Sequence, residues 1–173
     1  MLFKRAYNRG VARLAARWPA LARRLVESFQ PLAPDDGQIP WTPFTKPLSQ
    51  CKLALVTTAG IHHPHQPPYD MADKTGDPSF RILDSETIEG SYTITHDYYD
   101  HRDARRDLNI VFPLTRLKEI HAAGCIDAVS RRHFSFMGHI TGAHVATLIK
   151  TTAPQVARLL REDAVDAVVL TPA

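Results

Sequence analysis

The feature that most constrains this 173-residue chain is an uninterrupted apolar stretch, CKLALVTTAG, at residues 51–60. Its length suits a strand, and its lack of alternation indicates a strand covered on both faces, as in a parallel sheet between helical layers. Further strands are expected at 91–96, from 125 to about Ser130 and at 164–173, and helices at 112–124, 141–150 and 153–163. This alternation predicts an α/β fold with a Rossmann- or flavodoxin-like parallel sheet of about four strands.

Residues 1–30 form a basic arm with a net charge of +6, whereas the rest of the chain carries −3. A helix with one apolar face is expected here, because apolar residues recur at helical spacing: Tyr7, Val11, Leu14, Trp18, Leu21 and Leu25. Pro19 is expected to kink this helix or to start a second one. The arm is expected to dock on its own domain or on a second subunit. Binding to a membrane surface or to nucleic acid, and a targeting peptide, are the alternatives.

Residues 31–50 hold five prolines and no sustained periodicity, which predicts a linker before a domain at 51–173. Ile39, Trp41 and Phe44 are expected to fix this linker to the domain surface. No apolar run approaches the ~18 residues of a membrane span. Since the basic charge belongs to the arm, it does not indicate nucleic acid as a ligand of the domain. The two cysteines lack C-x-x-C spacing and indicate neither a disulfide framework nor a thiolate zinc site, so we expect a cytoplasmic protein.

A proline-stiffened loop, TTAGIHHPHQPPYD, follows the first expected strand at residues 57–70. Its His62, His63 and His65 are candidate metal ligands, but the spacing H-H-x-H fits neither a helical turn nor alternate strand positions. A metal held by two of them with His96 or Asp100, a pocket-lining acid or base, and a solvated turn are the three interpretations. The prolines favour a loop that holds polar groups in fixed directions.

The segment GDPSFR, residues 76–81, places an arginine after an Asp-Pro turn. Arg81 is a candidate clamp for a substrate carboxylate, because a guanidinium binds carboxylates through two parallel hydrogen bonds. An ion pair with Asp77 or Asp84 that only fixes the turn is the alternative. Glycine-rich nucleotide-binding motifs are absent from the sequence.

The segment HDYYDHRDARRDLN, residues 96–109, follows the expected strand 91–96. His96 beside the carboxylates of Asp97 and Asp100 has the composition of a general acid or base. The alternative is that Asp100 or Asp103 caps a short helix.

A third histidine-bearing segment, RRHFSFMG, follows the strand that is expected to end near Ser130. His133 is a candidate pocket residue, with structural packing as the alternative. Loops that leave the carboxyl ends of parallel strands meet at one edge of a sheet. We therefore expect all three histidine-bearing segments to converge there.

These motifs together resemble the selenoprotein B family of glycine, sarcosine, betaine and D-proline reductases. The resemblance covers residues 51–172 and rests, in order, on TTAGIHHPHQPPYD, GDPSFR, THDYYD, DLNIVFPLTRL, HFSFMG and VDAVVLTP. It implies reductive cleavage of a carbon–nitrogen bond by a selenocysteine or cysteine in the loop directly after the strand VDAVVLTP. The sequence ends at Ala173, where that residue is expected, so the resemblance implies an incomplete sheet and an N-terminal half. Cys51 and Cys125 are expected at the opposite edge.

The resulting expectation is a subunit or relative of such a reductase, acting on a small zwitterion. We expect His62 and His96 as acid/base groups and Asp100 as the partner of a histidine, with Arg81, Asp77 and His133 binding substrate. No cofactor is evident, and a metal on His62, His63 and His65 is the weaker alternative. A homo-oligomer or a complex with a Cys- or Sec-bearing subunit is expected. The other alternative is a non-catalytic binding or assembly protein.

Overall fold

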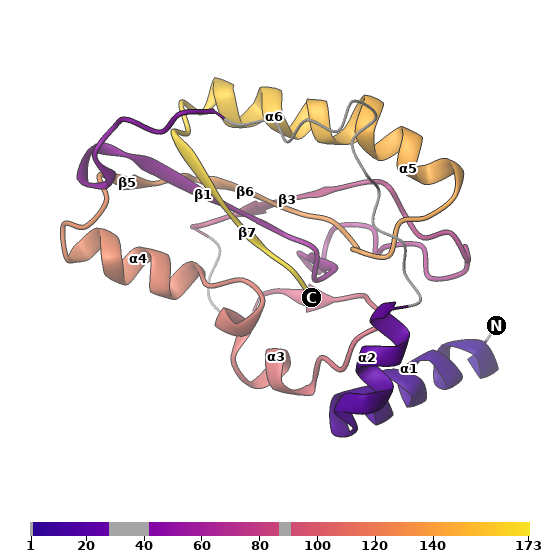
Figure 1. The fold of residues 1–173 in the computed structure, drawn as a ribbon. Helices are drawn as coiled ribbons and strands as arrows, with labels where there is room; N and C mark the ends of the chain where they lie inside the picture. The colour runs from indigo at the N-terminus through magenta and orange to yellow at the C-terminus, as the bar shows by residue number, and fades with distance from the viewer. Residues whose placement is uncertain (1, 28–41, 87–90) are drawn as a thin grey trace.

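The computed structural model describes residues 2–27, 42–86 and 91–173. It has a central sheet between two helical layers (Figure 1). Helix α4 (Leu114–Ala122) covers one face, and α5 (Ala143–Thr147), a π-helical segment at Leu148–Thr152 and α6 (Ala153–Glu162) cover the other. The expected α/β class is thereby confirmed. Pro154 lies in the first turn of α6, where a proline costs no helical hydrogen bond.

Strand β1 (Lys52–Thr57) is the central strand of the sheet. Strand β7 (Ala167–Thr171) pairs with it in parallel along its whole length. Strands β5 (Ala128–Val129) and β6 (Arg132–Ser135) also pair with β1 in parallel, and β3 (Arg81–Asp84) adds to β6 in antiparallel orientation. The sheet is therefore mostly parallel, with one antiparallel strand that the sequence did not reveal.

The two faces of β1 belong to two separate cores. Leu53 and Leu55 pack toward α4 with Phe112 and Leu117, whereas Val56 joins a cluster with Phe134, Val156 and Leu160 against α6. Successive strand residues point to opposite faces, so an apolar residue at every position is needed when both faces are covered. This explains the uninterrupted apolar stretch.

The expected strand that ends near Ser130 continues instead to Ser135, interrupted between β5 and β6. At this interruption the Leu55 N–H donates to Nδ1 of His133 at 2.9 Å, in place of a ladder carbonyl. His133 is completely buried and meets the ring of Phe112 edge to face. The prediction that His133 follows the strand was wrong, because His133 lies within β6. The interrupted strand leaves one backbone N–H of β1 without a carbonyl partner, and the His133 ring accepts its hydrogen bond.

The expected strand 91–96 is also wrong as a member of the parallel sheet. Strand β4 (Thr93–Ile94) pairs antiparallel with β2 (Ile61–His62) in a separate two-stranded ribbon. Its β-branched residues indicate an extended backbone but not its pairing partner. The short helix α3 (Arg102–Arg106) and two 3-10 turns, at Leu48–Gln50 and Leu108–Ile110, complete the described elements.

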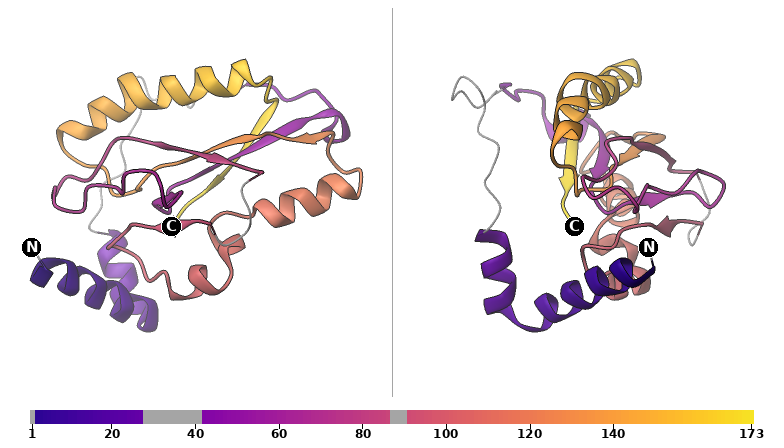
Figure 2. Two further views of the ribbon diagram at one scale, coloured as in Figure 1. Left: turned by 180° about the vertical axis from the view of Figure 1, so that it is seen from behind. Right: turned by 90° about the vertical axis from the view of Figure 1, so that its right-hand side faces the viewer.

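The arm folds into α1 (Leu2–Arg17) and α2 (Pro19–Glu27), so Pro19 starts a second helix as one of the two expected outcomes. Both helices lie beyond the end of the sheet at which β7 finishes (Figure 2). The arm docks on its own domain, but not through its apolar stripe. Trp18 is 59% exposed, and Tyr7 and Leu14 are exposed as well. The arm contacts the domain through ion pairs of Arg5 and Arg9 with Asp97.

Ile39 and Trp41 of the expected linker lie outside the described residues, and Phe44 is exposed. The domain boundaries at 30 and 50 stay predictions. None of the described helices combines the length and the hydropathy required to span a bilayer.

The role of His133 makes stability depend on pH. Burial lowers its pKa from 6.5 to about 4, so the unfolded chain binds the proton first as the pH falls. The contribution of this histidine is complete above pH 6.5 and is lost between pH 6.5 and 4. We expect wild type to lose about 3 kcal/mol more than His133→Asn over this range, measured by denaturant unfolding at several pH values.

A matched pair of variants separates the hydrogen bond from the proton. His133→Asn keeps an acceptor for the Leu55 N–H, whereas His133→Leu leaves it buried and unpaired, at a cost of about 1–3 kcal/mol. Equal stability of the two variants at pH 7.5 would show that the ring does not serve the strand.

Candidate functional site

The carboxyl end of β1 is a tight junction built by two glycines. Gly60 and Gly138 have φ angles of +67° and +85°, values that glycine adopts without strain. A Cβ on Gly60 would lie 2.5 Å from the Thr95 carbonyl oxygen, and one on Gly138 would lie 2.6 Å from the Thr58 carbonyl oxygen. Both positions also closely approach His96. Only glycine allows the β2–β4 ribbon to sit this close to the end of the sheet.

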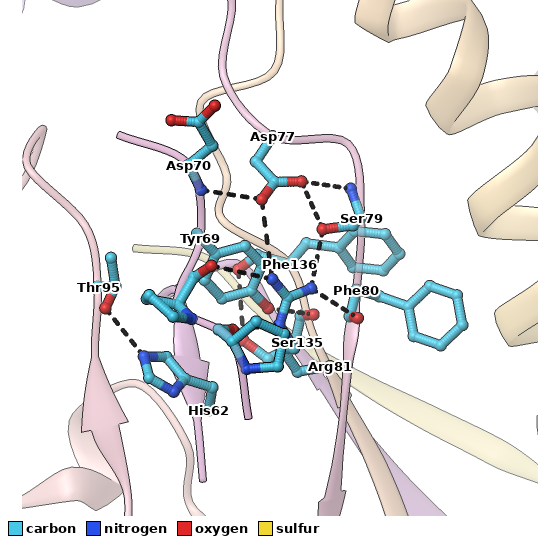
Figure 3. Close-up of polar contacts among 12 residues, drawn as sticks. His62, Tyr69, Asp70, Asp77, Ser79, Phe80, Arg81, Thr95, Ser135 and Phe136 are labelled. Carbon is cyan, nitrogen blue, oxygen red and sulfur yellow. Dashed lines mark hydrogen bonds and ion pairs between the residues drawn. The ribbon is translucent and has the colours of Figure 1, made fainter. Parts of the chain in front are cut away.

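His62, an expected acid/base residue, lies in β2 and is buried. Its Nδ1 lies 2.9 Å from the His63 carbonyl oxygen, and its Nε2 lies 2.9 Å from the Thr95 hydroxyl (Figure 3). A carbonyl accepts only, so Nδ1 carries the proton and Nε2 accepts from Thr95 in the neutral ring. His62 therefore reaches its surroundings through the hydroxyl of Thr95.

Thr95 opens onto a cleft of about 410 Å³ between the arm and the proline-rich loop. Arg5 of α1 forms one wall and residues 68–72 form another. The volume is within the range of small-ligand sites. Three other clefts, of about 360, 380 and 450 Å³, lie around Tyr92, Leu108 and Asp100. No histidine lines any of these four clefts, but the cleft at Thr95 has a wall residue that is hydrogen-bonded to an expected acid/base histidine, His62.

His96, the second expected acid/base residue, is buried between the two glycine turns. Its Nδ1 accepts a hydrogen bond from the Tyr98 N–H, and its ring packs edge to face on Tyr99. Burial lowers its pKa to about 4, so the ring is neutral at pH 7. Its Nε2 makes no hydrogen bond to the described part of the chain. His96 thus presents a neutral, polar imidazole next to the cleft wall.

Asp97 is the anchor of the arm. It is 1% exposed, and its carboxylate accepts from Nε of Arg5 at 2.6 Å and from Nε of Arg9 at 2.9 Å. Burial opposes ionisation, but the hydrogen bonds from the two guanidiniums hold the pKa of Asp97 below its ordinary value. The arginines lie four residues apart on α1 and so share one face of the helix. The arm supplies the countercharge for a carboxylate that the domain buries.

Asp100, the expected partner of a histidine, binds Arg102 instead. The Arg102 side chain donates to it at 2.6 Å, and the Arg102 N–H donates to it at 3.2 Å. An arginine two residues away provides a stronger, charge-assisted partner than a neutral imidazole. The alternative role at the start of the α3 helix describes this residue better.

Arg81 and Asp77, expected to bind substrate, form a closed network around the proline-rich loop (Figure 3). The guanidinium of Arg81 donates to four oxygens, those of the Pro67, Pro68 and Phe80 carbonyls and of the Ser79 hydroxyl. It also stacks on the Tyr69 ring at 4.4 Å. Asp77 lies 3.8 Å from Arg81. This is the ion pair that was the expected alternative to a substrate clamp.

Asp77 itself accepts hydrogen bonds from Ser79 and from the Asp70 N–H. These bonds overcome the effect of burial and hold its pKa below the ordinary value. Tyr69 closes the network by donating to the Ser135 carbonyl at 2.6 Å. The network fixes the loop that forms one wall of the cleft.

The other two histidines of the loop, His63 and His65, contact different residues from those that His62 contacts. Nε2 of His63 accepts from the Asp84 N–H at 3.1 Å, and its ring stacks on Tyr92. His65 also stacks on His63 and is exposed. Burial lowers the pKa of His63. Across residues 2–27, 42–86 and 91–173, no three His, Cys, Asp or Glu side chains group as metal ligands.

Sequence reasoning did not identify three contributors to this cleft: Arg5, Tyr69 and Thr95. Thr95 directly precedes His96, and the alternation of Thr93, Ile94 and Thr95 was a usable signal, because it places two hydroxyls on one face of a strand. No local pattern connects Arg5 to Asp97, which lies 92 residues away.

The chain is similar to subunits of amino-acid reductases along most of its length. The family model "Glycine/sarcosine/betaine reductase selenoprotein B" matches residues 20–173. D-proline reductase subunit gamma of Acetoanaerobium sticklandii is 34% identical over 145 residues, 84% of this chain and 57% of that protein. Glycine reductase complex component B subunit gamma of Symbiobacterium thermophilum is 32% identical over 141 residues, 80% of this chain and 32% of that protein.

Sarcosine reductase complex component B subunit beta of Peptoclostridium acidaminophilum is 30% identical over 138 residues, 78% of this chain and 30% of that protein. The chain thus spans between about a third and 57% of the length of these relatives. No solved structure matches it.

The ionic anchor of the arm is testable by removing its carboxylate. In Asp97→Asn, the arginines lose their partner, and we expect amide hydrogen exchange in α1 to become about tenfold faster or more. Asp100→Asn is the matched control, because it removes an equal charge from a pair that lies within the same loop. Equal protection of α1 in the two variants would contradict an arm held by Asp97.

Proposed function

Because the chain belongs to the glycine/sarcosine/betaine reductase selenoprotein B family, we propose that it is a subunit of a B-type reductase that cleaves the carbon–nitrogen bond of a small amino acid or betaine. The observation that carries the proposal is the family match over residues 20–173. The relatives are named as subunits of D-proline, glycine and sarcosine reductases. The cleft at Thr95 supports the proposal as well, because it has the volume of a small-ligand site and its Thr95 is hydrogen-bonded to His62.

The proposed reaction consumes two thiol-type groups. An alkylammonium substrate and a dithiol, or a thiol–selenol pair, give R–H, the protonated amine and a disulfide or selenenyl sulfide. The carbon–nitrogen bond breaks, a carbon–hydrogen bond forms, and the two chalcogens are oxidised. Renewed reduction of that bond requires an external electron donor.

The nucleophile in this proposal comes from a polypeptide segment other than residues 1–173. The sequence holds two cysteines. Cys51 is buried directly before β1, and Cys125 is exposed after α4. Both therefore lie at the amino edge of the sheet, opposite the cleft. A partner subunit that carries a cysteine or selenocysteine is the proposed source.

The role proposed for this chain is proton handling and orientation. Thr95 lines the cleft and its hydroxyl donates to Nε2 of His62, so the imidazole can take up a proton from a group in the cleft through the hydroxyl. The neutral ring of His96 orients the same wall. The proposal assigns no metal and no cofactor to this chain.

The partner is proposed to cover the free edge of β7. Among the described strands, β7 pairs with β1 alone, and its Leu170 is 73% exposed. Exposed strand edges attract further strands and are usually covered in native proteins. Either a complex with the Cys- or Sec-bearing subunit or a homo-oligomer satisfies this edge.

A second candidate function is a non-catalytic subunit that binds the same zwitterion. The position of both cysteines at the edge opposite the cleft favours it, because neither cysteine of residues 1–173 can then reach a ligand in the cleft. The two candidates differ in whether turnover depends on the Thr95 hydroxyl.

Reconstitution with a Cys- or Sec-bearing partner tests the proposal. We expect amine release from glycine, sarcosine or betaine, or ring opening of D-proline to a primary amine, in the presence of a dithiol, and about a 100-fold lower kcat in Thr95→Val, as for loss of an acid/base group. Thr93→Val is the matched control on the same strand and should retain activity. Equal rates for the two variants would favour the binding-only subunit, and no amine release with any partner would refute the reductase.

A further inference from the structure

Arg5 takes part in two features at once, the ion pair with Asp97 and the wall of the cleft. Its Nε and Nη2 donate to the two oxygens of Asp97, at 2.6 and 3.4 Å. A guanidinium offers five N–H groups, and those on Nη1 make no hydrogen bond within the described residues. Arg9 binds the same carboxylate through its Nε but borders a different, smaller hollow beside Tyr99.

The charges at this wall do not balance. Two guanidiniums, from Arg5 and Arg9, face the single carboxylate of Asp97, so one positive charge is left over. Arg5 is the basic residue that lines the cleft. Arg81, predicted as the clamp, has its donors occupied by backbone and side-chain oxygens and is not available to a ligand.

The opposite charge is present on another wall of the same cleft. Asp70 is exposed; its N–H donates to Asp77, and one of its oxygens accepts from the Ala72 N–H at 2.7 Å. These bonds fix the backbone around it and leave the second carboxylate oxygen without a partner among the described residues. A cleft that carries one unbalanced cation and one carboxylate matches the charges of a zwitterion.

We propose that Arg5 binds the carboxylate of the amino-acid substrate in this cleft, with Asp97 as the positioning residue that holds the guanidinium at the wall. The inference rests on the proposed function for the class of ligand. Arg5 precedes residue 20, where the family match begins, so the arm adds to the site a group that the matched region does not contain. The ammonium end of the ligand faces Asp70.

The test compares two arginines that share one partner. Arg5→Gln and Arg9→Gln each remove one guanidinium from Asp97, but only Arg5 lines the cleft. Binding of glycine, sarcosine, betaine and D-proline to the full chain is measured by calorimetry. For any member that binds wild type, we expect Arg5→Gln to weaken binding by about 10- to 100-fold, the effect of losing a charged hydrogen bond. Arg9→Gln should change it less than about threefold.

Two further measurements separate ligand binding from arm docking. Glycinamide and D-prolinamide lack the carboxylate, so their affinities should be low and unaffected by Arg5→Gln. Hydrogen exchange in α1 reports docking in each variant, and Arg5→Lys, which keeps the charge but not the planar fork, should restore docking and only part of the affinity. Equal losses in Arg5→Gln and Arg9→Gln, no loss in either, or no binding to wild type would each overturn the proposal.

The reconstituted complex distinguishes this inference from the function on which it rests. Amine release with an unchanged KM in Arg5→Gln would refute the role of Arg5 and leave the reductase proposal standing. Arg5-dependent binding without amine release in any reconstituted complex would refute the reductase and leave the binding site standing.

Discussion

Strand β1 is bonded along both edges and covered on both faces, and the rest of the molecule is arranged around it. Its ladder partners lie on β7 on one side and on β5 and β6 on the other. Leu53 and Leu55 belong to the core under α4, and Val56 contributes to the core under α6. A strand in this position leaves no backbone donor to water, so each one requires a partner inside the protein. The ring of His133 provides that partner where the neighbouring strand is interrupted.

The location of the cleft follows from the same strand. Where β1 ends at Thr57, the chain turns through Gly60 and returns as one strand of the β2–β4 ribbon. Ligand sites in open α/β sheets form where the chain leaves the carboxyl ends of the strands. Here the ribbon narrows that region, buries His62 and His96, and leaves Thr95 as the group in contact with the cleft. Both histidines are therefore shielded from solvent.

The sequence predicted those parts of the fold that depend on local pattern. The apolar stretch identified β1, Pro19 indicated a kink or a second helix, and the order of segments indicated an α/β architecture. The sequence did not predict which strands pair with each other, because a β-branched segment such as 93–94 fits a two-stranded ribbon as well as a central sheet. The composition of the proline-rich loop identified Arg81 and Asp77 as polar residues but could not reveal that each is satisfied within the loop. The contact between Arg5 and Asp97 joins segments too distant in sequence for any spacing rule.

The arm is held on the domain by opposite charges, and each needs the other as its partner. Without the arm, Asp97 would be a buried anion lacking a countercharge, and without Asp97, two guanidiniums would face each other across one turn of α1. Substitution at either end therefore leaves an unpaired charge, which only a compensating substitution at the other end removes. Residues 5, 9 and 97 should accordingly vary together among homologous chains, although 88 and 92 residues separate them. Where chains carry this arm, we therefore expect it to be inherited together with Asp97.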